Sequence, residues 1–265
     1  MAKSGEIDYL KNLIKLYGDH AISHAVGKPF SDPHCPAYLA EIAAVLALLP
    51  PPPARLLDLG CGTGWTSFFF AKCGYEVTGV DIAPDMIHHA CLRRDREGPE
   101  HLQFRTADYE ELDGEASFDA VVFFDALHHA VDENAALRCA FRALKPGGLC
   151  ITSEPGGRHS HSAGAVEAVR KFNVTEKNMP PLRIIGQARK LGFRDYRVYP
   201  HAFRMHREVF RRPAFAPAAG HRLLRALRVA ARLATGPWRL CYRSLRLSAW
   251  SNVACWVNGI TVLVK

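Results

Sequence analysis

The sequence lacks the features that mark several large classes of protein. Its eight cysteines include no CxxC pair, which argues against a zinc ribbon or a thioredoxin-like site. No apolar run approaches the roughly 18 residues that a membrane-spanning helix needs. The first residues, MAKSGEIDYLKNL, lack the uninterrupted apolar segment of a signal peptide. We therefore expect a cytoplasmic protein with reduced cysteines.

Charge is distributed unevenly along the 265 residues, although the overall composition is that of an ordinary globular protein. Hydrophobic residues make up 48% and charged residues 23%, so disorder is not expected. From residue 201 onward there are 12 Lys and Arg residues against one acidic residue, Glu208, whereas the rest of the chain is mildly acidic. The net charge of +8 therefore comes from the C-terminal quarter, which is predicted to meet an anionic partner.

Short apolar segments alternate with helical segments through the middle of the chain. Two helices, 7–26 and 37–49, are predicted before the four prolines at 50–53, which end helical structure. The alternation that follows is typical of βαβ units and a parallel sheet in an α/β fold. Residues 155–179 are expected to be irregular. The predicted strands are 54–59, 75–81, 101–108, 118–127 and 147–154, and the predicted helices are 64–74, 84–96, 132–144 and a segment ending at Gly192.

The sharpest motif is LLDLGCGTG at residues 56–64, between a predicted strand and a predicted helix. Its glycines allow a tight turn and a close approach of the backbone to a ligand. The GxGxG spacing, with Asp58 inside the strand end, differs from the GxGxxG loop of dinucleotide-binding folds. The Asp58 carboxylate can accept hydrogen bonds from the ammonium of a zwitterionic amino acid, directly or through water. The expected ligand-binding loop contains Gly60, Cys61, Gly62 and Gly64.

Two acidic residues at the ends of the next two strands complete a nucleoside-binding pattern. Asp81 ends the second strand about 20 residues after the glycines, where a carboxylate can accept both hydroxyls of a ribose. Asp108 closes the third strand and can accept the exocyclic amine of adenine, although a carboxylate there also suits the capping of a turn. Ile82 or Tyr109 can pack on the face of the adenine ring.

At these residues the chain resembles the class I S-adenosylmethionine (SAM) dependent methyltransferases. The resemblance implies SAM as methyl donor and S-adenosylhomocysteine as product. It also implies a Rossmann-like α/β fold with a seven-stranded, mostly parallel sheet whose last strand is antiparallel. Met86 and Asp125 are further expected contacts of the cofactor. The resemblance covers about residues 54–154 and rests on the 56–64 loop, Asp81, the pair Ala107-Asp108, FDAVVFFDALHH at 118–129 and LKPGG at 144–148.

Four parts of the chain are expected from this fold. Residues 1–49 form an N-terminal helical cap, 50–199 the SAM-binding core, 200–250 a basic insertion, and 251–265 the last strand of the core sheet. The insertion contains a predicted amphipathic helix at 221–234 with its arginines on one face.

Three interpretations of the basic insertion stay open. In the first, the helix packs on the protein body and its arginines face solvent. In the second, it docks on a membrane surface together with the Arg- and Trp-containing stretch 238–250. In the third, it contacts nucleic acid. Residues 156–181 look similar to methyltransferases associated with bacterial glycan assembly. That resemblance implies a sugar hydroxyl as the acceptor, including one on a lipid-linked glycan.

Histidines that follow the fourth and fifth predicted strands are the candidate catalytic bases. Oxygen and nitrogen acceptors gain from a base whose pKa is near neutral, which favours histidine. His128 and His129 follow one strand, and His159 and His161, with Glu154, follow the next. Both groups lie at the carboxyl edge of the sheet, where ligands bind in open α/β folds. The alternative is that His128 is packed and hydrogen-bonded and His129 is a solvated loop residue.

No metal site is expected, because neither these histidines nor His34 and Cys35 show ligand-pair spacing. The NPPY-type motif of adenine N6 methyltransferases and the Pro-Cys nucleophile of cytosine C5 enzymes are absent. We therefore predict a SAM-dependent methyltransferase that acts on a hydroxyl of a small molecule or glycan. It would work in the cytoplasm, free or peripheral to the inner membrane face. The alternatives are an RNA methyltransferase and a non-catalytic SAM-binding partner protein.

Overall fold

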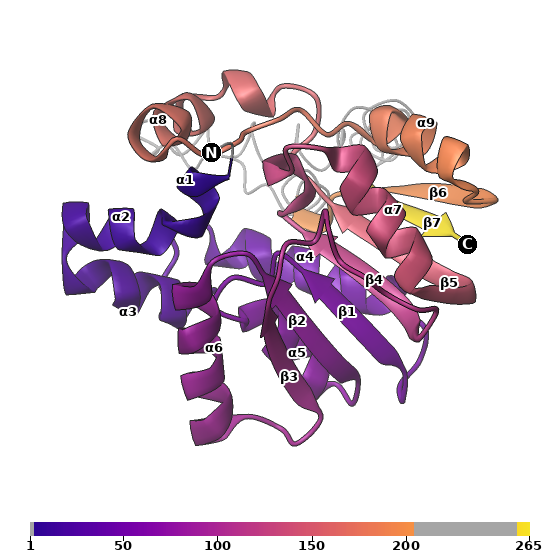
Figure 1. Cartoon of the computed structure of the whole chain (residues 1–265), viewed down its shortest axis with the longest axis horizontal. Coiled ribbons are helices and arrows are strands. Elements are labelled where there is room, and N and C mark those ends of the chain that lie inside the picture. Colours follow the sequence, from indigo (N-terminus) through magenta and orange to yellow (C-terminus); the bar gives the residue numbers. More distant parts are fainter. Residues whose placement is uncertain (1–2, 204–258) are drawn as a thin grey trace, which may run out of the picture.

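The computed structural model describes residues 3–203 and 259–265, and within them the chain forms an α/β fold around one sheet (Figure 1). The sheet has the order β3-β2-β1-β4-β5-β7-β6. Strands β1 to β5 pair in parallel, whereas β7 is antiparallel to both of its neighbours. The predicted fold class is therefore confirmed. The strands are β1 Arg55–Leu59, β2 Glu76–Asp81, β3 Leu102–Thr106, β4 Phe118–Phe124, β5 Leu144–Ser153, β6 Asp195–Pro200 and β7 Gly259–Val264.

Helices cover both faces of the sheet and bury two apolar clusters (Figure 1). On one face, α7 (Glu133–Ala143) and α9 (Pro181–Leu191) pack side chains such as Leu137 and Ile184 against the strands. On the other, α4 (Cys35–Leu48) and α5 (Trp65–Lys72) bury residues such as Val45 and Phe68. Helix α6 (Pro84–Glu97) packs beside β2 and β3. Because both faces are covered, the central strands are mostly apolar, as parallel strands usually are.

The N-terminal segment differs from the single helix predicted over 7–26. It forms α1 (Ser4–Ile7), α2 (Tyr9–Tyr17) and α3 (Asp19–Gly27). Gly18 ends α2 with a φ of 61°, in the left-handed region that only glycine adopts at little cost, so the chain turns sharply there. Helices α2 and α3 consequently lie side by side near the top of α6 (Figure 1).

The segment predicted to be irregular, 155–179, contains a ten-residue helix, so that prediction is wrong. Helix α8 (Ala163–Phe172) begins after Ser162, whose hydroxyl oxygen accepts a hydrogen bond from the backbone N–H of Ala165. It ends at Asn173, which adopts a left-handed φ of 54°. A serine N-cap and an asparagine C-cap are both signals of a helix. The prediction missed them because the preceding residues are rich in Gly, His and Ser, which is typical of a loop.

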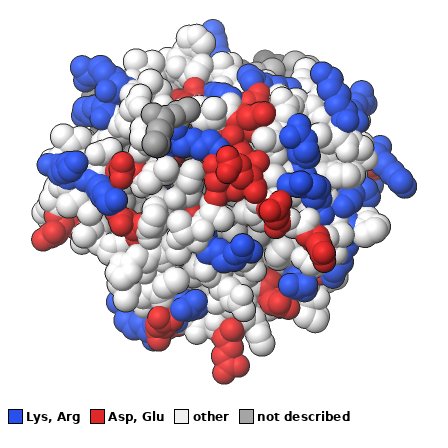
Figure 2. All heavy atoms as spheres, in the orientation of Figure 1, with Lys and Arg blue, Asp and Glu red and all other residues white. Residues whose placement is uncertain are grey.

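The basic insertion predicted at 200–250 lies outside the described residues beyond Phe203, and so does its amphipathic helix at 221–234. The domain boundaries stay predictions. In the described part, no helix is both long and apolar enough to cross a membrane. Figure 2 shows Lys and Arg side chains gathered on the side of this face where α9 and β6 lie. Basic surface is thus present on the sheet domain itself.

Candidate active site

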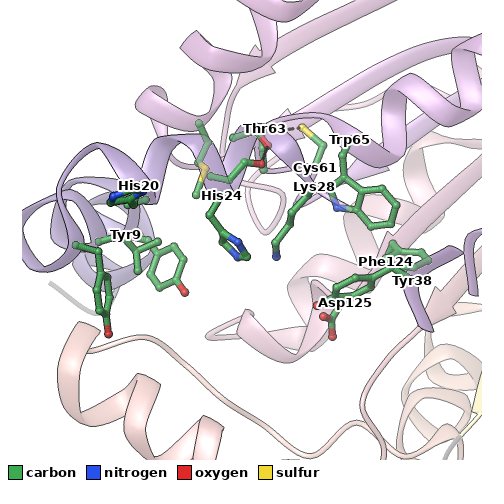
Figure 3. Close-up of a pocket in the computed structure, with 17 residues that line it drawn as sticks. Tyr9, His20, His24, Lys28, Tyr38, Cys61, Thr63, Trp65, Phe124 and Asp125 are labelled. Atoms are coloured by element: carbon green, nitrogen blue, oxygen red, sulfur yellow. Dashed lines mark hydrogen bonds between the residues drawn. The ribbon is translucent and has the colours of Figure 1, made fainter. Parts of the chain in front are cut away.

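Two adjoining cavities open at the carboxyl ends of the central strands. The larger, of about 530 Å³, lies between the loop after β1, the end of β4 and helices α2 to α4 (Figure 3). The smaller, of about 100 Å³, lies over the ends of β2 and β3. Tyr9, Gly60 and Met86 line both cavities, so one elongated ligand can reach from one to the other.

The glycines after β1 build a loop with one open side. The N–H groups of Gly60 and Cys61 donate to the carbonyl of Val80, at 2.8 and 3.1 Å, which ties the loop to β2. A Cβ atom on Gly60 would lie 2.6 Å from that of Ala126, whereas a Cβ on Gly62 would meet nothing within 4 Å. Gly60 therefore allows close packing, and Gly62 leaves room beside the backbone where a ligand can approach.

Asp81 holds this loop from the end of β2. One of its carboxylate oxygens accepts a hydrogen bond of 2.8 Å from Gly62 N–H, and the other accepts one of 2.9 Å from Ala83 N–H. Burial raises the pKa of Asp81, and these N–H donors oppose that rise by stabilising the charged form. Asp81 also lines the smaller cavity, beside the place where a ribose is expected.

All four residues predicted to contact the nucleoside, Asp81, Ile82, Asp108 and Tyr109, line the smaller cavity. Asp108 forms an ion pair with Lys3, and its carboxylate also accepts from Glu110 N–H at 2.9 Å. The Tyr109 hydroxyl donates to the Ala126 carbonyl at 3.0 Å, which fixes the ring in the cavity wall. Their contacts with adenine stay predictions.

His128 is buried in an ion pair at the end of β4. Its Nδ1 lies 2.7 Å from Glu154 Oε2, and its side chain is 3% exposed. Burial lowers the pKa of His128, but the hydrogen bond and charge of Glu154 outweigh that effect and raise it to about 9. His128 is therefore protonated at neutral pH and is unsuited to accept a proton. This agrees with the alternative of a packed His128.

His129 has the opposite electrostatic environment and lines the smaller cavity. Its ring stacks on that of His128 with centroids 4.0 Å apart. Burial and the neighbouring positive charge lower the pKa of His129 to about 4, so the ring is neutral at neutral pH. Its Nδ1 lies 2.7 Å from the carbonyl oxygen of Thr175, which can only accept. The proton is thus on Nδ1, and Nε2 carries a lone pair.

Glu6 is a candidate functional residue that no motif in the sequence indicates. It lies on α1, lines the smaller cavity with His129, and its Oε1 is 3.7 Å from His129 Nδ1. Burial raises the pKa of Glu6 to about 7, although the hydrogen bond from Thr175 N–H opposes the rise. A carboxyl group that titrates near neutral pH in a cavity wall is typical of acid–base sites.

The two histidines that follow the fifth strand, His159 and His161, lie in different surroundings. His159 lies beside His128, with ring centroids 4.8 Å apart, and its Nε2 is 2.5 Å from Glu176 Oε2. His161 is exposed and contacts Ser160, so it lies outside this cluster. In the described part of the chain, the donor atoms of one group of three residues, His128, His129 and Glu176, lie within 4.8 Å of one another, close enough for a metal ion. The expectation that no metal binds stays a prediction.

The comparisons with known proteins agree with this geometry. Residues 56–148 match the family described as "Methyltransferase domain". A ubiquinone biosynthesis O-methyltransferase of Xanthomonas campestris pv. campestris is 38% identical over 120 residues, which are 44% of this chain and 48% of that protein. The chain spans about half the length of the curated relatives it matches.

Residues 56–148 form a class I SAM-dependent methyltransferase domain. Two solved structures share its fold. Phosphoethanolamine N-methyltransferase 2 of Haemonchus contortus, solved with SAM, aligns over 97% of this chain and 60% of its own, with a TM-score of 0.60 and 23% identity. The [4+2]-cyclase SpnF aligns over 98% and 95%, with a TM-score of 0.57 and 19% identity. Because one neighbour is a cyclase, the fold alone does not determine the reaction.

In the methyltransferase domain, Asp58 lies behind the glycine loop and lines neither cavity. It is 1% exposed, and its Oδ2 accepts hydrogen bonds of 2.6 Å from the hydroxyls of Thr66 and Ser67 on α5. Burial raises the pKa of Asp58 to about 6, and the hydrogen bonds from the two hydroxyls limit this rise. Asp58 therefore joins β1 to α5 and supports the loop from beneath, and its contact with an ammonium group stays a prediction.

We expect Asp58→Ala to lower the free energy of unfolding by about 2–4 kcal/mol, because two buried hydroxyls lose their acceptor. Urea denaturation without ligand measures this directly. Asp95→Ala, which removes an exposed carboxylate at the end of α6, should change stability little. Equal stability of the two variants would show that the Asp58 hydrogen bonds do not support the loop.

The larger cavity has an aromatic wall that the motifs did not indicate. Its rings come from helices and strands that are far apart in the sequence, and Figure 3 shows most of them around the opening. A single tyrosine or tryptophan in a sequence does not indicate a ligand cavity, because such residues usually pack in the hydrophobic core. The rings are Tyr9, Tyr17, Tyr38, Trp65 and Phe124.

Proposed function

We propose that this protein transfers the methyl group of SAM to a hydroxyl group of a small molecule or glycan. The observation that carries the proposal is a pair of adjoining cavities beside the glycine loop that share Tyr9, Gly60 and Met86. Neutral His129 lies in the wall of one, and aromatic rings lie in the wall of the other. A donor and an acceptor can then meet near Gly60, where the cavities join.

The residues present fit the cofactor. Gly62 leaves the loop open to a ligand, and the smaller cavity offers the Asp81 carboxylate to a ribose. The nucleoside would lie over β2 and β3, and the remainder would extend into the larger cavity. When bound, SAM supplies an electrophilic methyl group on a sulfonium centre.

His129 is the group that we assign as the base. Its Nε2 would accept the proton that the acceptor hydroxyl loses on methylation, and the other product would be S-adenosylhomocysteine. The resulting imidazolium would be stabilised by the Thr175 carbonyl at 2.7 Å and by the Glu6 carboxylate at 3.7 Å. Glu6 must be charged to stabilise the imidazolium of His129, because the neighbouring His128 ring is also positively charged.

The pH dependence of the reaction should therefore follow Glu6. Its folded-state pKa of about 7 means that the carboxyl is protonated below neutral pH, so we expect kcat to rise as the pH increases from 6 to 8. Glu6→Gln should lower kcat above pH 7 and remove most of that rise. A rate profile that is the same in wild type and Glu6→Gln would exclude this role for Glu6.

Oxygen as the acceptor atom is supported by the curated relatives, which are named O-methyltransferases. The aromatic wall of the larger cavity suits a flat ring or the apolar face of a sugar. The membrane and RNA interpretations depend mainly on residues 200–250, most of which lie outside the described residues, whereas the glycan interpretation rests on the resemblance of residues 156–181. They remain proposals that an acceptor screen addresses.

The test is a methyl-transfer assay with labelled SAM on the full chain, run against phenolic small molecules, lipid-linked glycans and RNA, each with and without EDTA. We expect label in a hydroxyl-containing small molecule or glycan, and the same rate with EDTA. Label in RNA alone would contradict the proposal, and cofactor binding without turnover on any acceptor would favour a non-catalytic role. Loss of the rate with EDTA would assign a metal to the histidine cluster.

A further inference from the structure

Two histidines and a glutamate bring their ligand atoms together beside the smaller cavity. One ring nitrogen of His128, one of His129 and one carboxylate oxygen of Glu176 lie within 4.8 Å of one another. His128 Nε2 is already 3.6 Å from Glu176 Oε2. The ligand atoms of a tetrahedral zinc ion lie roughly 3.3 Å apart, so the main adjustment is a movement of the His129 ring by about 1 Å.

Each of these three side chains is oriented by a partner on its other side. His128 Nδ1 lies 2.7 Å from Glu154 Oε2, and His129 Nδ1 donates to the Thr175 carbonyl at 2.7 Å. A hydrogen bond from His159 Nε2 orients the glutamate. Metal-binding histidines usually donate one ring N–H to a carboxylate or a backbone carbonyl, which leaves the other nitrogen for the ion. The cluster therefore has the outer hydrogen bonds of a metal site.

Acidic groups surround the two rings. Each of four carboxyl groups has an oxygen between 2.7 and 3.9 Å from a ring nitrogen of His128 or His129, and none of the four forms an ion pair with a described Lys or Arg. Two of the four side chains are only 0% and 9% exposed. Because buried negative charge is costly unless it is paired, a bound cation would stabilise this cluster. The four residues are Glu6, Asp125, Glu154 and Glu176, and Asp125 also lines the larger cavity.

The ligand types and the position of the cluster suit zinc. Two imidazoles and one carboxylate form the ligand set of open zinc sites, which keep a fourth position for water. Mg²⁺ prefers oxygen ligands and is a poor match. The His129 side chain is 32% exposed and lines the smaller cavity, so an ion can reach the cluster from that cavity.

We propose that His128, His129 and Glu176 bind a Zn²⁺ ion that inhibits the enzyme. A neutral imidazole has one lone pair, so an ion bound to His129 takes the lone pair that the assigned base uses. Two metal–nitrogen bonds and one metal–oxygen bond form, and the proton on His128 Nε2 passes to bulk water. The inhibition rests on the proposed function, whereas ion binding does not. The ion is an inhibitor and not a cofactor, so catalysis itself needs no metal.

A Co²⁺ titration of the full chain tests the site without turnover, because Co²⁺ accepts zinc ligands and absorbs visible light strongly when four- or five-coordinate. We expect one such site in wild type, from which Zn²⁺ but not Mg²⁺ displaces the Co²⁺. Glu176→Gln should weaken Co²⁺ binding by at least about 10-fold. Glu167→Gln removes an exposed carboxylate of α8 that pairs with Lys171, and this matched control should bind like wild type.

Nuclear magnetic resonance of the wild type gives a second measurement that needs no variant to fold. The ring ¹⁵N signals of His128 and His129 should both shift when Zn²⁺ is added. The site is overturned if these signals stay unchanged at saturating Zn²⁺. Equal Co²⁺ absorption in wild type and a folded Glu176→Gln variant would also overturn it.

Methyl transfer to the acceptor that the screen identifies tests the inhibition. We expect Zn²⁺ to lower the rate, EDTA to restore it and Mg²⁺ to have no effect. Half-inhibition of Glu176→Gln should need at least about 10-fold more Zn²⁺ than that of wild type. A rate that Zn²⁺ leaves unchanged or increases once the site is occupied would contradict the inhibitory role. If no acceptor is methylated, the proposed function fails, while the Co²⁺ titration still decides whether the ion binds.

Discussion

Asp81→Ala should weaken binding of S-adenosylhomocysteine by at least about 100-fold. The carboxylate is proposed to accept both ribose hydroxyls, and a hydrogen bond to a charged group contributes about 1.5–3 kcal/mol. The same carboxylate accepts the N–H groups of Gly62 and Ala83, so its removal also releases the loop that faces the ligand. Two ligand bonds and one loop restraint are lost together, which makes this the largest binding effect we expect.

Isothermal titration calorimetry of the variant provides the measurement, with circular dichroism to verify the fold. Asp119→Ala is the matched control, because Asp119 also accepts a backbone N–H, that of Arg55 at 2.8 Å, but at the opposite end of β4. The control should bind S-adenosylhomocysteine like wild type. An Asp81 variant that is folded and binds with undiminished affinity would place the nucleoside elsewhere.

His129→Gln should lower kcat by about 10²–10⁴-fold, the usual contribution of a positioned general base. Binding of S-adenosylhomocysteine should fall much less than kcat, because His129 lines the cavity proposed for the nucleoside but its assigned role is with the acceptor proton. The reason for choosing His129 over His128 is electrostatic. His128 is protonated by its pairing with Glu154, whereas His129 is neutral and keeps the Nε2 lone pair.

Single-turnover rates with labelled SAM measure this effect, and His161→Gln is the control. His161 is exposed and lies outside the cluster formed by His128, His129 and His159, so its replacement should leave the rate unchanged. If His161→Gln impaired the reaction and His129→Gln did not, the base would belong to the segment after β5. A full rate in both variants would show that the acceptor needs no histidine.

The parts of the molecule that local sequence determines could be predicted well. Strand β1, the glycine loop and the end of β2 are encoded within residues 54–81; their alternation indicates the fold, and the resemblance that their motifs carry implies the cofactor. Errors arose where one residue changes the path of the chain. Gly18 splits the first helix with a φ of 61°, and the polar residues before α8 concealed that helix.

The pairing of Glu6 with His129 could not be found in this way, because distant segments bring the two residues together. Glu6 and His129 are more than 120 residues apart in the sequence and meet because both contact the backbone of Thr175. Their roles depend on burial and on neighbouring charges, which a linear pattern does not contain.

The choice among four candidate histidines shows the same limit. All four follow strands at the correct edge of the sheet, so sequence position does not single out one of them. Contacts separate them: His128 pairs with Glu154, His159 with Glu176, and His161 faces solvent, which leaves His129 with an available nitrogen at a cavity.

The measurement that tests the account most directly is a calorimetric titration of the wild-type chain with SAM and with S-adenosylhomocysteine. We predict one site per chain for each ligand, with micromolar affinity and mutual competition. A folded wild-type protein that binds neither ligand, alone or with a mixture of hydroxyl-containing acceptors, would contradict the proposed function and the assignment of both cavities.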